Sequence, residues 1–215
     1  MLTILFLVFT HVMKFEIENY PLYLLLGIIL WNNFSRGTSM GMNSILNRSS
    51  ILKNIYLPKE VLPASSVLTS FIMLVFEFMI FVIFLIIFNF NPGFTGLYLL
   101  PICGLLLLLG LGVSFPLSIL RVKFKDLDYI WTIILHAGFF ASPIIYRLDM
   151  FPDDVQRILL INPVAQILNM SYLVTLEKTI PKTADILYTI LVVLSILGIG
   201  YLIFHYKQKN IVEEI

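Results

Sequence analysis

The stretch RVKFKDLDYIWTIILHAGFFASPIIY, residues 121–146, joins a charged segment to a long apolar one. Three basic and two acidic residues lie within its first eight positions. The apolar run that follows ends at a Ser-Pro pair shortly before Tyr146. Because a helix needs about 20 mainly apolar residues to cross a bilayer, the stretch predicts a membrane-spanning helix at about 128–146, preceded by a charged loop.

The composition of the whole chain supports a membrane protein. Of its 215 residues, 59% are hydrophobic and only 13% are charged, and the mean hydropathy is +0.95. Soluble domains carry about 25% charged residues, so the bilayer is the expected solvent for much of this apolar surface. The formal net charge of +1 provides no basic field, and we expect no nucleic-acid partner.

Apolar segments recur along the chain and predict an all-α membrane protein with a single transmembrane domain over 1–215. These segments lie at about 1–12, 21–46, 64–89, 97–119, 128–146 and 183–205. The last four are long enough to span, whereas the first is too short, as if the chain began inside a helix. The second contains polar residues such as Asn33, so we expect its polar face to meet protein or water.

The basic residues of the connections predict the orientation, because cytoplasmic loops are enriched in Lys and Arg. One side would hold nine of these basic residues, if Arg36 is counted at the end of its helix. They are Arg36, Arg48, Lys53, Lys59, Arg121, Lys123, Lys125, Lys207 and Lys209. The other side would hold five: Lys14, Arg147, Arg157, Lys178 and Lys182. We therefore expect the charged end of 121–146 and the C-terminus to be cytoplasmic.

Two connections are themselves expected to form helices. The segment SILNRSSILKNIYLPKEVLP predicts a short amphipathic helix at about 44–57, lying on lipid headgroups or docked into a partner protein. On the outer side, 152–176 predicts two short amphipathic helices that do not span, because Asn162-Pro163 breaks the pattern. A hairpin on the outer surface with no gating role explains this second pattern equally well.

Few residues of the apolar segments suggest chemistry. Glu77 is the one carboxylate deep within a predicted span, and Ser66, Ser70 and Met73 share its helix face, so this stripe is expected to face protein. Glu77 could contact a substrate, a second copy or a proton, or could serve packing alone. Gly110, Ser114 and Ser118 recur every four residues, which predicts close helix packing.

Catalytic and nucleotide-binding signatures are missing from the sequence. It contains neither a phosphate-binding G-x-x-x-x-G-K-[ST] loop nor an H-E-x-x-H motif, and it offers no carboxylate pair suited to acid–base work. His136 has no second ligand at a suitable spacing, so we expect no metal site. We predict no catalytic residues, and any active work would draw its energy from a partner or an ion gradient.

Six stretches, taken in order, carry a family resemblance: YPLYLLLGIILWNNFS, NSILNRSSILKNIYLPKEVLP, LRVKFKDLDYI, FFASPIIY, LLINPVAQIL and FHYKQKNIVEEI. Together they resemble the ABC-2 type transporter permeases, specifically the branch that exports O-antigen or teichoic-acid polysaccharides. The resemblance implies a six-helix permease bundle in the cytoplasmic membrane of a prokaryote. Family members have a complete first span, and because Met1 falls inside that span here, we expect the first helix to be truncated.

The resemblance also implies partners and site residues. A homodimer of the permease would bind ABC-type ATPase subunits, which hold ATP and Mg²⁺, while this chain itself binds no cofactor. A lipid-linked glycan would pass between the two copies, and membrane lipid would surround them. The ATPase-coupling residues would be Arg48, Lys53, Tyr56, Lys59, Arg121, Lys123, Lys125 and Asp126. The gate region would contain Tyr146, Phe151, Asn162 and Pro163.

Two other functions remain open at this stage. An ABC-2 exporter of a drug or small lipid would have the same fold and a different cargo. A membrane-embedded lipid-modifying enzyme would need catalytic carboxylates or histidines close together, and only Glu77 and His136 are candidates.

Overall fold

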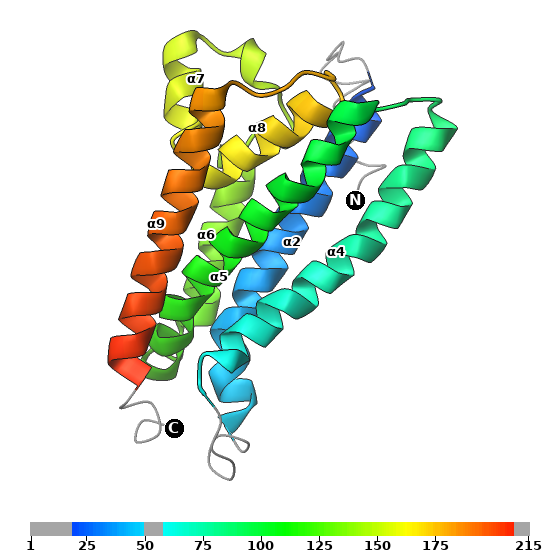
Figure 1. The fold of residues 1–215 in the computed structure, drawn as a ribbon. Helices are drawn as coiled ribbons and strands as arrows, with labels where there is room; N and C mark the ends of the chain where they lie inside the picture. The colour runs from blue at the N-terminus through cyan, green and yellow to red at the C-terminus, as the bar shows by residue number, and fades with distance from the viewer. Residues whose placement is uncertain (1–18, 50–57, 209–215) are drawn as a thin grey trace.

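The computed structural model describes residues 19–49 and 58–208, and in these residues all regular structure is helical (Figure 1). This confirms the predicted all-α fold class. The predicted segment 1–12 and most of the predicted helix 44–57 lie outside the described residues. The elements are α2 (Tyr20–Asn47), α4 (Val61–Ile87), η2 (Phe94–Tyr98), α5 (Leu99–Lys123), α6 (Leu127–Ala141), η3 (Leu148–Met150), α7 (Asp153–Leu159), α8 (Pro163–Thr175) and α9 (Thr183–Lys207).

Three described helices are long and apolar enough to cross a membrane: α4, η2 with α5, and α9. Each exposes large apolar side chains to its surroundings, as Phe76 and Ile86 do on α4. Exposed apolar surface on this scale needs lipid or another protein to cover it. By length and composition these helices make the chain a multi-pass membrane protein.

Helix α6 is shorter than the sequence predicted. It ends at Ala141 rather than near 146, because Ser142 is extended (φ −103°, ψ 147°) immediately before Pro143. A proline disfavours helical backbone at the residue before it, so the Ser-Pro pair stops the helix. The remaining 15 residues are too few to span a bilayer of ordinary thickness unless the membrane or neighbouring segments adapt.

Helix α2 forms the centre of the bundle and packs against both α4 and α5. Leu22, Leu24, Leu26 and Leu30 are completely buried, and burial extends around the helix rather than along one stripe. Although α2 has 28 residues, it does not count among the apolar spans, because it carries polar side chains along its length. Protein rather than lipid therefore surrounds most of α2.

Small residues allow α5 to approach its neighbours closely. A Cβ atom added to Gly200 of α9 would collide with the backbone carbonyl oxygen of Gly112 on α5. On another side of α5, Ser114 meets Gly41 of α2, and a Cβ on Gly41 would overlap the Ser114 hydroxyl. Gly110, Ser114 and Ser118 are all buried, as their spacing predicted. Close backbone approach is the usual basis of helix association in membranes.

We predict that Gly200→Ala destabilises the protein by about 1–3 kcal/mol, because the new methyl group meets a backbone that has little freedom to move. Gly198→Ala is the matched control on the same helix, since a Cβ there meets no atom within 4 Å. It should leave stability unchanged or raise it slightly, because alanine favours helix more than glycine does. Thermal unfolding in detergent compares the two variants, and equal melting temperatures would contradict the close crossing.

Candidate functional site

The end of α2 and the start of α4 lie beside the end of α9 at one end of the bundle (Figure 1). We call this the inner end and the opposite one the outer end, because the basic residues predict that this end is cytoplasmic. The side chain of Arg48 donates to the Ser65 hydroxyl at 2.8 Å, which joins α2 to α4. The Lys59 ammonium donates to the backbone oxygen of Gln208 at 2.6 Å, and the Gln208 amide donates to Glu60 at 2.8 Å. Both flanks of the segment 50–57 are therefore fastened to transmembrane helices.

The eight predicted coupling residues fall into two sets along the chain, a first surface within 48–59 and a second within 121–126. Of the four residues in the first, the structure places Arg48 and Lys59 at this inner end. Lys53 and Tyr56 lie outside the described residues, so their contacts stay a prediction. Gln208 and Glu60 were not singled out from the sequence. Their spacing of 148 positions gives no local signal, because the contact depends on how α9 packs.

The charged loop before α6 forms a second polar cluster at the same end. The Arg121 guanidinium donates to the Asn43 side-chain oxygen at 2.9 Å, and the Asn43 amide donates to Asp128 at 3.0 Å. Arg121 also donates to the backbone oxygen of Lys125, which closes the turn between α5 and α6. Asn43 thus links α2 to two other helices, a role that the sequence analysis missed.

The other residues predicted for this second surface lie in the same turn. Lys123 is the last residue of α5, Lys125 is exposed, and Asp126 immediately precedes α6 without a side-chain cap bond. The structure therefore brings Arg121, Lys123, Lys125 and Asp126 together at one end of the bundle. It also places them at the same end as Arg48, since both clusters bond to the last part of α2.

Midway along α2, an ion pair crosses to α4. The Arg36 guanidinium lies 2.6 Å from the Glu77 carboxylate, and both side chains are largely covered, with exposed fractions of 32% and 25%. Nearby, the Asn33 side-chain amide donates to the Ser70 backbone oxygen at 2.8 Å, and the Ser70 hydroxyl donates to the Asn33 backbone oxygen at 3.1 Å. Glu77 therefore faces protein and has a cation as its partner.

Two details of the prediction for this region were wrong. Arg36 does not lie at the end of its helix, because α2 continues to Asn47. Met73 is 39% exposed and does not share the buried face. The buried face contains Ser66, Ser70 and Leu74, which are spaced four residues apart. Met73 is three residues after Ser70 and therefore lies to one side of this face.

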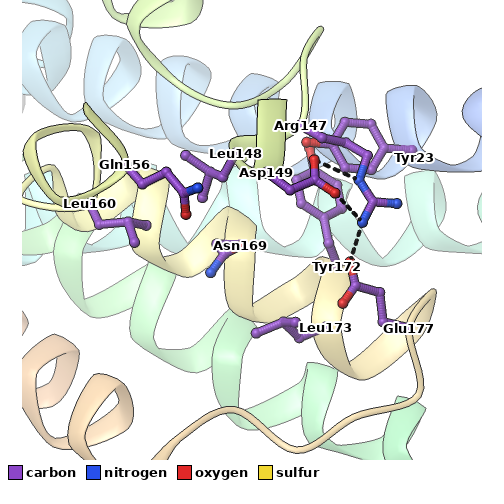
Figure 2. A pocket seen from close by; sticks show the side chains of 10 residues that line it. All are labelled: Tyr23, Arg147, Leu148, Asp149, Gln156, Leu160, Asn169, Tyr172, Leu173 and Glu177. Carbon is purple, nitrogen blue, oxygen red and sulfur yellow. Dashed lines mark hydrogen bonds and ion pairs between the residues drawn. The ribbon is translucent and has the colours of Figure 1, made fainter. Parts of the chain in front are cut away.

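At the outer end, Arg147 joins two segments that are distant in sequence (Figure 2). Its guanidinium forms ion pairs with Asp149 at 3.0 Å and with Glu177 at 2.9 Å. These groups line a cavity of about 240 Å³ together with Tyr23, Gln156 and Asn169, among others. The loop after α6 is thus tied to the end of α8.

Two tyrosines at the start of α2 hold the same loop. Tyr20 donates to the backbone oxygen of Ile145 at 3.1 Å. The Tyr23 hydroxyl lies 2.9 Å from the backbone oxygen of Pro143 and 2.8 Å from that of Tyr146. Its ring stacks on Tyr172 of α8, with centroids 3.8 Å apart. The start of α2 therefore contacts both the loop after α6 and α8.

The predicted gate residues flank α7 and begin α8. The Tyr146 ring packs against Phe151 with centroids 5.2 Å apart, and partial burial raises the pKa of the Tyr146 phenol, which keeps it neutral. The Asn162 side chain accepts a hydrogen bond from Val164 N at 3.0 Å and so caps α8, whose first residue is Pro163.

Helix α8 does not lie on the outer surface as a hairpin would. It turns from α7 by 113° and is buried along most of its length, from Val164 to Thr175, against α2, α5 and α9. Figure 1 shows it crossing the bundle between α9 and α5. By contrast, α7 has no buried residue. The structure places α7 on the surface of the bundle, and the expectation of a surface position is wrong for α8. That this end of the bundle faces outward stays a prediction.

Metal chemistry finds no support in the described part of the chain. Across residues 19–49 and 58–208, no three His, Cys, Asp or Glu side chains are placed to hold an ion together. The clusters described above consist of ion pairs and hydrogen bonds, which position helices.

We predict that Arg36→Leu and Glu77→Leu each destabilise the protein by about 3 kcal/mol, since either change leaves one covered charge without its partner. The double variant should lose about 1–3 kcal/mol less stability than the two single losses added together, because both charges are then removed. Thermal unfolding of the four proteins in detergent measures this coupling. Additive losses would show that the two side chains do not interact.

We predict that Asn162→Ala lowers stability by about 1 kcal/mol through loss of the α8 cap. Asn162→Asp should retain most of the stability, because a carboxylate accepts the same hydrogen bond from Val164 N. Limited proteolysis between α7 and α8, measured beside thermal unfolding, should show faster cleavage in the alanine variant alone. The same cleavage rate in all three proteins would argue against a capping role.

Comparison with known proteins identifies the family. The ABC-2 type transporter family matches residues 1–175. Two O-antigen export system permease proteins RfbA from Klebsiella pneumoniae are 27% and 25% identical to the chain, over 77% and 92% of its length. A protein of the same name from Myxococcus xanthus is 26% identical over 97% of the chain.

The chain spans 64%, 77% and 81% of the lengths of these three relatives. The resemblance that the six sequence stretches suggested is thereby confirmed, and the all-helical bundle agrees with it. The protein is a multi-pass membrane protein that belongs to the ABC-2 type transporter family.

Proposed function

We propose that the chain is the membrane-spanning subunit of an ABC exporter that moves a lipid-linked polysaccharide across the cytoplasmic membrane. A separate ATPase subunit would bind ATP and Mg²⁺ and supply the energy. The observation that carries the proposal is the similarity to three O-antigen export permeases over most of the chain. Two copies of the chain would form the path, and each would expose the apolar face of α6 to the other or to lipid.

The inner end is suited to receive force from such a partner. On either side of residues 50–57 in the sequence, Arg48 is bonded to α4 and Lys59 is bonded to the end of α9. A helix there that docks on an ATPase through Lys53 and Tyr56 would therefore pull on several helices at once. The cluster around Arg121 would add a second contact surface and pass the movement to α5 and α6.

Helix α2 connects this end to the proposed gate. Its 28 residues extend about 42 Å at 1.5 Å per residue, which is sufficient to cross the membrane. At its outer start, Tyr20 and Tyr23 bond to the loop that leads to α7, and Tyr23 stacks on α8. A shift of α2 driven from the inner end would therefore act directly on the loop after α6 and on α8.

The first test is an affinity pull-down of the tagged chain from native membranes in mild detergent, with mass spectrometry of its partners. We expect an ABC ATPase in roughly equal amount. Lys53→Glu and Tyr56→Glu should each lower its recovery about tenfold, which corresponds to about 1.4 kcal/mol of binding free energy. Arg157→Glu is the matched control, because Arg157 is an exposed basic residue on α7, at the opposite end.

The outcomes separate the parts of the proposal. Absence of an ATPase from the unmodified protein would contradict the exporter function. Equal recovery with Lys53→Glu, Tyr56→Glu and Arg157→Glu would place the contact elsewhere on the inner end. If an ATPase is recovered but vesicles reconstituted with both proteins export no polysaccharide, a drug or small lipid would be favoured as the cargo.

A further inference from the structure

Helices α5, α8 and α9 come together near the outer end of the bundle (Figure 1). Side chains from these three helices line an apolar cavity. It has a volume of about 200 Å³ and is distinct from the cavity beside Arg147. The side chains that line it are apolar apart from Tyr98, and those used below are Ile102, Leu105, Met170, Ile186 and Ile190. The phenol of Tyr98 is the single polar side-chain group in the lining.

The cavity is more than large enough for water, yet it lacks what water needs. A buried water occupies about 10–15 Å³ on this measure and makes about three hydrogen bonds to polar groups, whereas apolar cavities stay dry. Ile102 and Leu105 belong to the span that contains α5, and Ile186 and Ile190 belong to the span α9. The cavity therefore lies between two helices that are long and apolar enough to span a membrane.

A basic residue directly follows the part of the lining that precedes α9. Ile180 and Pro181 form part of the lining, Lys182 follows at the start of α9, and Lys178 precedes them. Lys182 is exposed, and Lys178 lies over the Phe90 ring, 4.9 Å from its centroid. Of the acidic residues in this part of the chain, Glu177 is paired with Arg147, and Asp185 lies in the first turn of α9.

We propose that this cavity binds one hydrocarbon chain of a resident anionic membrane lipid, with the lipid phosphate at Lys182. Hydrocarbon gains little from leaving one apolar medium for another, so the chain alone provides shape and not much selectivity. A phosphate beside basic residues at the membrane surface gains electrostatic energy and selects the lipid by charge. Tyr98 lines the cavity and is half exposed, and such amphipathic rings are common at membrane interfaces.

Native mass spectrometry of the purified, delipidated protein tests the site. The protein is titrated with phosphatidylglycerol and, separately, with phosphatidylcholine. We expect one phosphatidylglycerol to bind about tenfold more tightly than phosphatidylcholine. Ile190→Phe fills the cavity and should reduce occupancy by phosphatidylglycerol about tenfold. Leu191→Phe is the matched control, because it also introduces a phenylalanine, but at an exposed position of α9.

The headgroup contact is tested by Lys182→Gln, with Arg157→Gln as a control that removes an exposed charge from α7. The first should abolish the preference for phosphatidylglycerol, and the second should leave it intact. Unchanged binding to Ile190→Phe would overturn the cavity as the site, and equal binding of both lipids to the unmodified protein would overturn the charge selection. If Ile190→Phe melts earlier than the unmodified protein, Leu105→Phe fills the same cavity from α5. Binding is measured without an ATPase, so the result is independent of the proposed exporter function.

Discussion

The polar side chains of α2 must find partners inside an apolar environment, and this requirement positions much of the bundle. An unpaired polar group away from water costs free energy, and an unpaired charge costs far more. Along α2 the partners come at three levels: Tyr20 and Tyr23 bond to the loop after α6, Arg36 pairs with Glu77, and Asn43 bonds to Arg121 and Asp128. Each level fixes a different neighbour of α2.

This arrangement makes α2 a rigid connection between the two ends of the protein. The contacts at its inner end involve α4, α5 and α6, and those at its outer end involve α8 and the loop before α7. A change at one end that moves α2 as a unit must break or carry along the contacts at the other. Under the proposed function, α2 would carry movement from an ATPase at the inner end to the outer end.

The other half of the bundle is held together differently. Between α5 and α9 the contact rests on Gly112 and Gly200, whose missing side chains let the two backbones approach. Such packing depends on shape, so it tolerates lipid around it but not added volume. Where α8 meets α5 and α9 the fit is looser and leaves the apolar cavity beside Ile186 and Ile190. The side of α5 that faces α2 therefore combines polar pairing with the close contact of Gly41 and Ser114, whereas the side that faces α9 depends on Gly112 and Gly200.

The sequence by itself determined the all-helical membrane class, the approximate bounds of α2, α4, α5 and α9, and the family, because hydropathy, proline breaks and motif order are properties of consecutive residues. It also predicted that the stripe containing Ser66 and Ser70 faces protein. Only the tertiary structure decided the partner of Glu77, which is 41 positions away, and the burial of α8. A helix that is apolar on one face can lie on a surface or turn inward. The choice depends on the space left by neighbouring helices, and no local pattern records that space.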